Sequence, residues 1–196
     1  MNAPKVHGLI LAGGTSQRLG SDKAELVYHD KPQIQYIYEL LNSLISEVYI
    51  SVSKVENLKF KYQQIQDNCT HIKGPLNGVL SAHKKYPNAA WLVFAVDMPF
   101  VTGKTIQKLI INRNPTCLAT AYTKKDTKQP EPLAAIWEPE GLRMILDTWK
   151  ETDGKYPSEF LKDNLIRIKL IQPKDDIELK NVNSMEEFKS ARDWIG

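Results

Sequence analysis

Residues 11–23 read Leu-Ala-Gly-Gly-Thr-Ser-Gln-Arg-Leu-Gly-Ser-Asp-Lys, and they directly follow an apolar run at Val6 to Leu11. The run predicts a buried first strand. The two adjacent glycines predict a tight turn whose backbone N–H groups can approach phosphate oxygens closely. Arg18 and Lys23 would add positive charge beside a phosphate chain. The spacing matches neither Gly-x-x-x-x-Gly-Lys-Ser/Thr nor Gly-x-Gly-x-x-Gly, so we expect a phosphate loop of another type.

Outward from this stretch, strand-like and helix-like segments alternate along the chain. Strands are expected at residues 48–52, 63–66, 91–96, 117–122, 133–137 and 166–171. Helices are expected at residues 32–44, 75–86, 139–149, after Thr102 and from Ser184, where Ser-Met-Glu-Glu has the form of a capping box. The polar stretches 124–129 and 151–157 are expected to be loops. This alternation predicts one α/β domain over residues 1–196, a three-layer sandwich with a mostly parallel central sheet.

Composition is that of an ordinary globular protein, with 42% hydrophobic and 25% charged residues. Lysine plus arginine exceeds aspartate plus glutamate by 26 to 23, an excess too small to favour nucleic acid or an anionic membrane. The first residues show no secretory signal, and no apolar run reaches membrane-spanning length. Cys69 and Cys117 lack metal-ligand spacing. We therefore expect a cytoplasmic monomer with reduced thiols that binds neither nucleic acid nor membrane.

A second chemical signal is Asp97, which follows the apolar run 91–96 directly. In parallel α/β sheets the ligand site lies beyond the carboxyl ends of the strands, so Asp97 and the glycine turn should share one edge. A carboxylate there suits Mg²⁺, which prefers oxygen ligands and bridges to substrate phosphates. An isolated strand-end aspartate could equally cap a turn or pair with a lysine. Together with the glycine turn, it favours nucleotide binding.

Three motifs carry a resemblance to a known family: the glycine stretch 11–23, Gly-Pro-Leu-x-Gly at 74–78 and Val-Asp-Met-Pro at 96–99. The chain resembles the molybdenum cofactor guanylyltransferases almost from end to end, including Asn-Val-Asn-Ser-Met-Glu-Glu at 181–187. These enzymes belong to the nucleotidyltransferases with a Rossmann-like, sugar-nucleotide pyrophosphorylase-like fold, which the resemblance implies here.

The resemblance implies a nucleotide site made of Leu11, Ala12, Gly13, Gly14, Lys23, Ser51, Asp67 and Asp97. Lys23 would contact the phosphates, Arg18 would hold the departing pyrophosphate and Asp97 would bind Mg²⁺, so these three are the expected catalytic residues. Ser51 stands where the family has an asparagine, and serine lacks the amide's paired donor and acceptor. Asp67 falls where the family places a second nucleotide-contacting acid, although a solvated loop aspartate is the alternative.

The acceptor side is implied at Asn181 and Asn183, which would approach the pterin phosphate or the metal. Alternatively, Asn183 and Ser184 only begin a helix. Pro-Glu-Pro-Leu at 130–133 matches a family element near the pterin site, whereas residues 155–158 lack arginines that some members have.

The implied reaction transfers GMP from GTP to molybdopterin, giving molybdopterin guanine dinucleotide and pyrophosphate with Mg²⁺ as the cofactor. The resemblance also allows transient contact with other molybdenum cofactor proteins or apo-molybdoenzymes. One alternative is transfer of a cytidylyl or other nucleotidyl group to a pterin or a sugar phosphate. Related cytidylyltransferases tend to have Leu-Ala-Ala-Gly at the start of the loop, and Gly13 leaves room for a purine. A second alternative is a non-catalytic carrier of molybdopterin or nucleotide, against which Lys23 and Asp97 argue.

Overall fold

The computed structural model describes residues 3–12, 23–53, 62–69, 72, 74–123, 129–148 and 157–196. The strands are β1 (Val6–Leu11), β2 (Val48–Val52), β3 (Gln63–Gln66), β4 (Ala90–Ala95), β5 (Ala119–Thr123), β6 (Pro130–Trp137) and β7 (Ile168–Ile171). The α-helices are α1 (Gln33–Asn42), α2 (Pro75–Lys85), α3 (Gly103–Ile111), α4 (Pro139–Thr148), α5 (Pro157–Asp163) and α6 (Met185–Ile195). Short 3₁₀ helices are η1 (Lys23–Glu25), η2 (Leu165–Arg167) and η3 (Asp176–Leu179).

One seven-stranded sheet in the order β3-β2-β1-β4-β6-β5-β7 forms the centre of the molecule. Neighbours β3, β2, β1 and β4 pair in parallel, as do β5 and β7. Strand β6 runs antiparallel to both β4 and β5. The expected mostly parallel sheet is confirmed, and β1 and β4 end side by side with Leu11 paired to Ala95.

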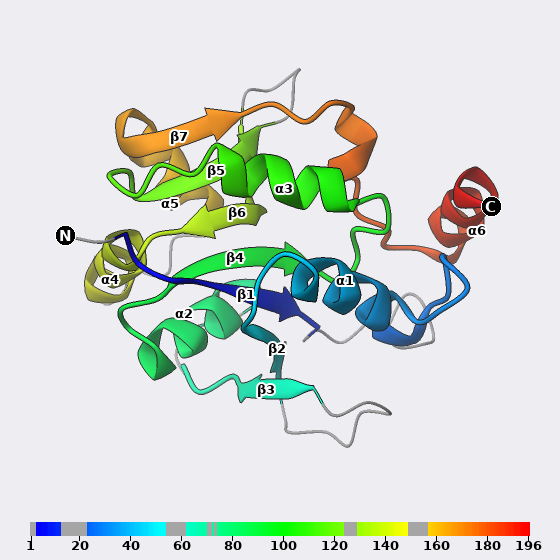
Figure 1. Cartoon of the computed structure of the whole chain (residues 1–196), viewed down its shortest axis with the longest axis horizontal. Helices are drawn as coiled ribbons and strands as arrows, with labels where there is room; N and C mark the ends of the chain where they lie inside the picture. Colours follow the sequence, from blue (N-terminus) through cyan, green and yellow to red (C-terminus); the bar gives the residue numbers. More distant parts are fainter. Residues whose placement is uncertain are drawn as a thin grey trace.

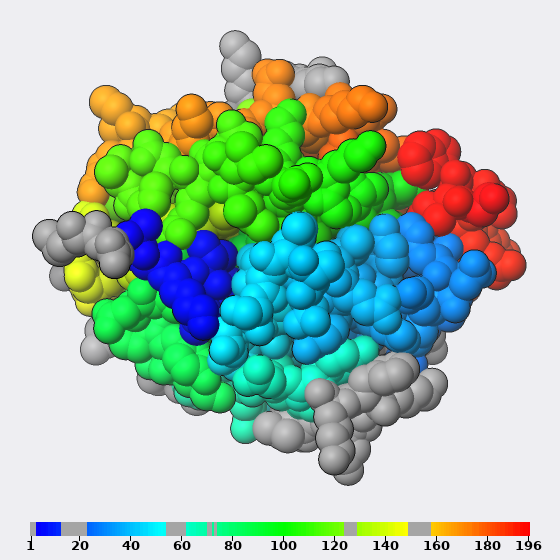
Figure 2. Space-filling view, viewed as in Figure 1, coloured from blue at the N-terminus to red at the C-terminus, as the bar shows by residue number. Residues whose placement is uncertain are grey.

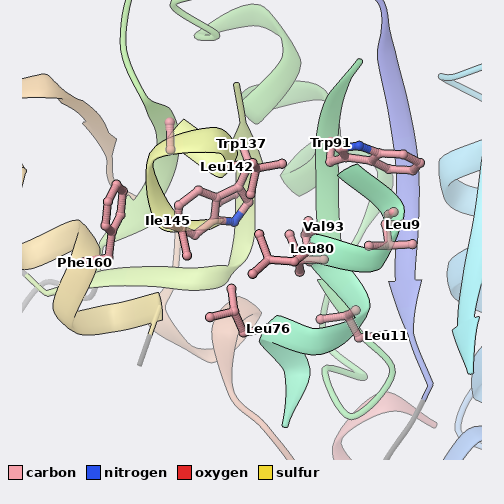
Figure 3. Packing of buried hydrophobic residues seen from close by; sticks show 14 of the residues in the cluster. Leu9, Leu11, Leu76, Leu80, Trp91, Val93, Trp137, Leu142, Ile145 and Phe160 are labelled. Carbon is pink, nitrogen blue, oxygen red and sulfur yellow. The ribbon is translucent and has the colours of Figure 1, made fainter. Parts of the chain in front are cut away.

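Helices cover both faces of the sheet, which makes the three layers (Figure 1). Apolar residues of α1 and α3, such as Ile37 and Ile106, pack on one face. Helices α2, α4 and α5 pack on the other face, where Leu80, Ile145 and Phe160 contact the central strands (Figure 3). The fully buried strand β4 therefore reads as a continuous apolar run, as expected for a strand covered on both sides.

The C-terminal segment crosses the carboxyl edge of the sheet and ends in α6 at one end of the molecule (Figure 1). Ser184 caps α6 by accepting a hydrogen bond from the Glu187 backbone N–H at 3.2 Å, so the predicted capping box is confirmed. Figure 2 shows α6 packed against the early part of the chain. This contact includes Tyr28 against Phe188, and α6 also contacts the turn after β4 through Phe100 against Trp194.

Most expected elements match within two residues, and four differences have a bearing on the fold. The strand expected at 133–137 begins three residues earlier, at Pro130. The strand expected at 166–171 begins only at Ile168, because residues 165–167 form η2 and leave the Ile166 side chain 98% exposed. The strand expected at 117–122 starts at Ala119, after a turn in which the Cys117 N–H bonds to the Asn114 carbonyl. The loop expected at 151–157 falls mostly outside the described residues, and Pro157 begins the unexpected helix α5. In the part of the chain that is described, we find no helix with the length and apolarity needed to span a bilayer.

Candidate functional site

Asp97 lies in the turn that follows β4 and is the centre of a hydrogen-bond network. Its Oδ2 accepts from Lys23 Nζ at 2.8 Å, and its Oδ1 accepts from Asn181 Nδ2 at 3.0 Å. Its backbone carbonyl accepts from the Val182 N–H at 2.8 Å. Both carboxylate oxygens are therefore held by donors from distant parts of the chain.

Lys23, the first residue of η1, joins this network to the C-terminal segment. Its ammonium also donates to Asn183 Oδ1 at 2.5 Å, across 160 positions of sequence. The side chains of Lys23 and Asp97 are 21% and 17% exposed, so the ion pair is mostly shielded from water. Such a pair interacts more strongly than an exposed one, since solvent screens it less.

A second polar pair lies at the neighbouring strands β2 and β3. Ser51 on β2 donates its hydroxyl hydrogen to Asp67 Oδ1 at 2.7 Å, and the Asp67 N–H bonds to the Val52 carbonyl at 2.9 Å. Burial raises the pKa of the Asp67 carboxyl, while the hydrogen bond from Ser51 acts in the opposite direction. Asp67 is thus a half-buried acid held in place, rather than a freely solvated loop residue.

Helix α2 fixes the segment that carries Asp67, a contribution that the sequence reasoning missed. The Asn68 N–H donates to Ser81 Oγ at 2.8 Å, and the Cys69 N–H donates to Asn77 Oδ1 at 3.0 Å. The spacing of Asn77 and Ser81 places both on one helical face, where the Ser81 hydroxyl also donates to Asn77 at 3.1 Å. The four-residue spacing of Asn77 and Ser81 was the signal in the sequence that this face of α2 is polar and could bind a neighbouring segment.

Gly78 allows α2 to lie close to the end of the sheet. A Cβ at position 78 would lie 2.1 Å from Ser51 Oγ and 2.9 Å from Leu11 Cδ2, both too close for real atoms. The last glycine of the Gly-Pro-Leu-x-Gly motif is therefore needed for packing against the two expected nucleotide-binding residues.

Tyr28 is another residue beside the network that the sequence did not single out. Its side chain is buried, and burial raises its pKa to about 12, with the charges of Asp97 and Glu187 adding to the effect. The negative charge of Asp97 thus acts on the Tyr28 hydroxyl and favours its neutral form.

A cavity of about 780 Å³ opens beside the network, within the size range of small-molecule sites. It is lined by residues of β6, η3 and the C-terminal segment: Glu131, Asp176, Ile177, Leu179, Lys180, Asn181 and Asn183. Asn181 and Asn183 thus belong both to the Asp97 network and to the cavity wall.

The structure brings four of the predicted site residues into direct contact: Lys23, Asp97, Asn181 and Asn183. The other described residues lie on the adjoining strand ends. Leu11 accepts from the Val96 N–H at 3.1 Å, and Ala12 donates its N–H to the Ser51 carbonyl at 3.2 Å. Gly13, Gly14 and Arg18 lie outside the described residues.

A lysine facing an aspartate at the carboxyl edge of a mostly parallel α/β sheet lies where sheets of this kind bind their ligands. Solved structures share the fold. Molybdopterin-guanine dinucleotide biosynthesis protein A from Archaeoglobus fulgidus superposes with a TM-score of 0.77 at 19% identity, over 96% of this chain and 97% of that one. A CMP:2-keto-3-deoxy-manno-octonic acid synthetase, solved with CTP, superposes with a TM-score of 0.73 at 14% identity, over 97% of this chain and 98% of that one. The fold alone therefore does not select the base.

Residues 8–166 match the model of the MobA-like NTP transferase domain, and the chain belongs to that family. A molybdenum cofactor biosynthesis bifunctional protein of Synechocystis is 31% identical over 93% of this chain, which spans about half, 52%, of that longer relative. A protein of Natranaerobius thermophilus named "Probable molybdenum cofactor guanylyltransferase" is 26% identical over 97% of both chains.

Proposed function

We propose that the protein transfers GMP from GTP to the terminal phosphate of molybdopterin, forming molybdopterin guanine dinucleotide and pyrophosphate. The observation that carries this proposal is the 2.8 Å contact between Lys23 and Asp97 at the carboxyl edge of the sheet, beside a cavity of substrate size. Family membership and the names of the relatives support the same reaction.

The nucleotide would lie across the ends of β1, β2 and β4. The half-buried Asp67 carboxylate offers two acceptor oxygens, which suit the adjacent N–H donors at the edge of guanine. Lys23 would neutralise phosphate oxygens, and the family resemblance assigns the same task to Arg18. Positioning and charge neutralisation supply most of the catalysis in phosphoryl and nucleotidyl transfer.

Enzymes of this family generally use a divalent metal, and the residues present fit Mg²⁺. The Asp97 carboxylate and the amide oxygens of Asn181 and Asn183 are hard oxygen donors, and a cation, the Lys23 ammonium, already lies against two of these side chains. In the described ranges no three His, Cys, Asp or Glu side chains cluster as a metal site, which suits an ion that shares substrate phosphates and water. When bound, Mg²⁺ would neutralise charge on the α-phosphate.

The chemistry needs no proton transfer to the protein. A terminal phosphate oxygen of molybdopterin, anionic at neutral pH, forms the new bond to the α-phosphorus of GTP. The bond from that phosphorus to the oxygen bridging the β-phosphate breaks, and pyrophosphate leaves with the electron pair. The protein would therefore act by holding the molybdopterin phosphate and the GTP triphosphate, which are both anions, close together, with Lys23 beside the leaving pyrophosphate.

We assign the acceptor to the cavity next to Asn181 and Asn183. Lys180 and the two amides would hold the phosphate of the pterin, while the carboxylates of Glu131 and Asp176 would face its amino and ring N–H donors. We expect Lys180→Gln to raise the KM for molybdopterin and to leave the KM for GTP unchanged. A rise in the KM for GTP alone would contradict this assignment.

The reaction can be tested by incubating the protein anaerobically with molybdopterin, Mg²⁺ and each nucleoside triphosphate in turn while following pyrophosphate. We expect release with GTP only when molybdopterin is present. A preference for CTP would favour the cytidylyl alternative. Binding of GTP and molybdopterin without pyrophosphate release would favour the carrier.

Asp97→Asn tests the assigned chemistry against an exposed aspartate on α6, Asp193→Asn. We expect Asp97→Asn to lower kcat by about 10²–10³-fold, the usual effect of losing one electrostatic stabiliser, while most GTP affinity remains. Asp193→Asn should match the wild type. Full turnover in Asp97→Asn would remove the role given to this carboxylate. We further propose that the enzyme works as a cytoplasmic monomer that meets other molybdenum cofactor proteins only transiently.

A further inference from the structure

The ammonium of Lys23 occupies the position that a metal on Asp97 would need. It lies 2.8 Å from Asp97 Oδ2 and 2.5 Å from Asn183 Oδ1. The remaining carboxylate oxygen, Oδ1, accepts from Asn181 Nδ2 at 3.0 Å. Every carboxylate oxygen of Asp97 therefore already has an N–H donor.

A divalent ion and this ammonium cannot share these oxygens without strong repulsion. Mg²⁺ binds oxygen at about 2.1 Å, which on Asp97 Oδ2 would place it within a few ångströms of the Lys23 nitrogen. Removing the lysine without replacement would leave the negative charge of the carboxylate without a counter-ion. The two cations are thus alternatives at one place.

The lysine side chain is the partner free to move. The C-terminal segment is tied by its backbone, since the Val182 N–H donates to the Asp97 carbonyl at 2.8 Å and the Asn183 N–H donates to Glu187 Oε2 at 2.7 Å. Lys23 instead reaches its partners through a flexible four-carbon stem. A negatively charged acceptor nearby, such as a triphosphate, could draw it away while Asp97 and Asn183 stay in place.

We infer that Lys23 is an exchangeable internal counter-ion: it holds Asp97 and Asn183, competes with a divalent metal for their oxygens, and leaves those oxygens free for tight metal binding when nucleotide phosphates take the ammonium. This inference rests on the proposed function. It makes nucleotide and metal binding mutually reinforcing, because each favours the same displaced position of Lys23. It also makes binding of the metal alone weak.

The test measures Mn²⁺ binding without nucleotide, by the electron paramagnetic resonance signal of the free ion. Lys23→Met keeps the stem but removes the charge. Lys31→Met is the matched control, since Lys31 pairs with Glu39 at 2.7 Å on α1. We expect Lys23→Met to bind Mn²⁺ roughly tenfold more tightly than the wild type, within the usual range of coupling between two ligands. Lys31→Met should be unchanged. Equal or weaker binding by Lys23→Met would overturn the inference.

A measurement on the wild type distinguishes displacement of Lys23 from a simple change of charge. The ¹⁵N resonance of the Lys23 ammonium, identified by its loss in Lys23→Met, should report a hydrogen-bonded group. That signal should shift and broaden by exchange with water as Mg²⁺ approaches saturation. An unchanged signal at saturating Mg²⁺ would mean that Lys23 keeps its hydrogen bonds to Asp97 and Asn183 when the metal binds, which would refute the exchange.

Asp97→Asn separates this inference from the proposed function. If Asp97→Asn loses Mn²⁺ binding but Lys23→Met does not tighten it, the metal role of Asp97 stands and only the exchange fails. If Asp97→Asn binds Mn²⁺ as the wild type does, the metal site is not at Asp97. In that case the metal role proposed for Asp97 and the exchange of Lys23 both fail.

Discussion

Replacing Gly78 by alanine should disturb the nucleotide side of the site through a single methyl group. The new Cβ would lie 2.1 Å from Ser51 Oγ and 3.0 Å from Ser51 Cβ, with Leu11 Cδ2 at 2.9 Å. Rotating the Ser51 hydroxyl away would break its 2.7 Å hydrogen bond to Asp67 and would still leave the contact with Leu11. Helix α2 must therefore shift outward from the sheet.

Two effects of opposite sign determine how much Gly78→Ala changes the free energy of unfolding. Alanine is favoured over glycine inside a helix by about 1 kcal/mol. Overpacking a well-filled site costs about 1–3 kcal/mol, and the loss of a hydrogen bond costs about 1 kcal/mol more. We therefore expect Gly78→Ala to lose about 2 kcal/mol of unfolding free energy. For a chain of 196 residues this corresponds to a fall in Tm of about 4–8 °C.

The matched control is Gly103→Ala at the first residue of α3, where the nearest atom to an added Cβ is Leu40 Cδ2 at 3.9 Å. Thermal unfolding of both variants, with GTP titration by calorimetry, measures the effect. Gly103→Ala should be as stable as the wild type or slightly more so, with unchanged GTP affinity. Gly78→Ala should be less stable and bind GTP more weakly. Equal stability of the two variants would refute the reasoning.

A double variant identifies the clash as the cause. Ser51→Ala removes the hydroxyl that lies closest to the added methyl group. The unfolding free energy lost by Gly78→Ala/Ser51→Ala should therefore be smaller than the sum of the losses of the single variants. Strict additivity would mean that the methyl group is accommodated elsewhere.

Three further predictions concern buried charge and helix capping. Burial raises the pKa of Asp67 in the folded protein, so its protonated form stabilises the fold below the ordinary carboxyl pKa, and this stability is lost as pH rises through the raised pKa. Asp67→Asn should therefore raise Tm at neutral pH but not at acid pH. A constant difference in Tm between variant and wild type across a pH series of melts would contradict this. Arg113 pairs with the buried Glu138 through two 2.7 Å hydrogen bonds, so Arg113→Met should lose about 3–5 kcal/mol in urea unfolding, with much of the loss recovered by adding Glu138→Gln. Ser184→Ala removes the cap of α6 and should cost about 1 kcal/mol by the same assay, whereas an unchanged midpoint would show that Glu187 alone suffices.

Local signals explain why much of the fold could be predicted. The apolar runs of β1 and β4 mark strands buried on both faces, and Thr102 and Ser184 have the cap chemistry that begins α3 and α6. The general rule for parallel sheets then placed Asp97 at the ligand edge. The structure brings Lys23 into contact with Asp97 at that edge, while the glycines of the turn lie outside the described residues.

The remaining features depend on contacts between distant residues. A buried strand such as 130–137 has the same apolar pattern in either direction, so its antiparallel pairing could not be read from residues. Ile166 and Ile168 alternate as in a strand, but the turn of η2 exposes the first of them. The 2.5 Å bond from Lys23 to Asn183 joins positions far apart in sequence, and no local pattern encodes it.

The crossing of residues 180–184 over the sheet edge has a consequence for how the enzyme matures. The final strand, β7, ends at Ile171, so all seven strands precede the residues that reach Asp97. The seven strands can therefore pair before Asn181 and Asn183 emerge from the ribosome, whereas the hydrogen bonds of these two residues to Lys23 and Asp97 form only after that segment is made. A premature stop after β7 would keep all seven strands but would remove Asn181 and Asn183 together with the core residues Leu179 and Val182.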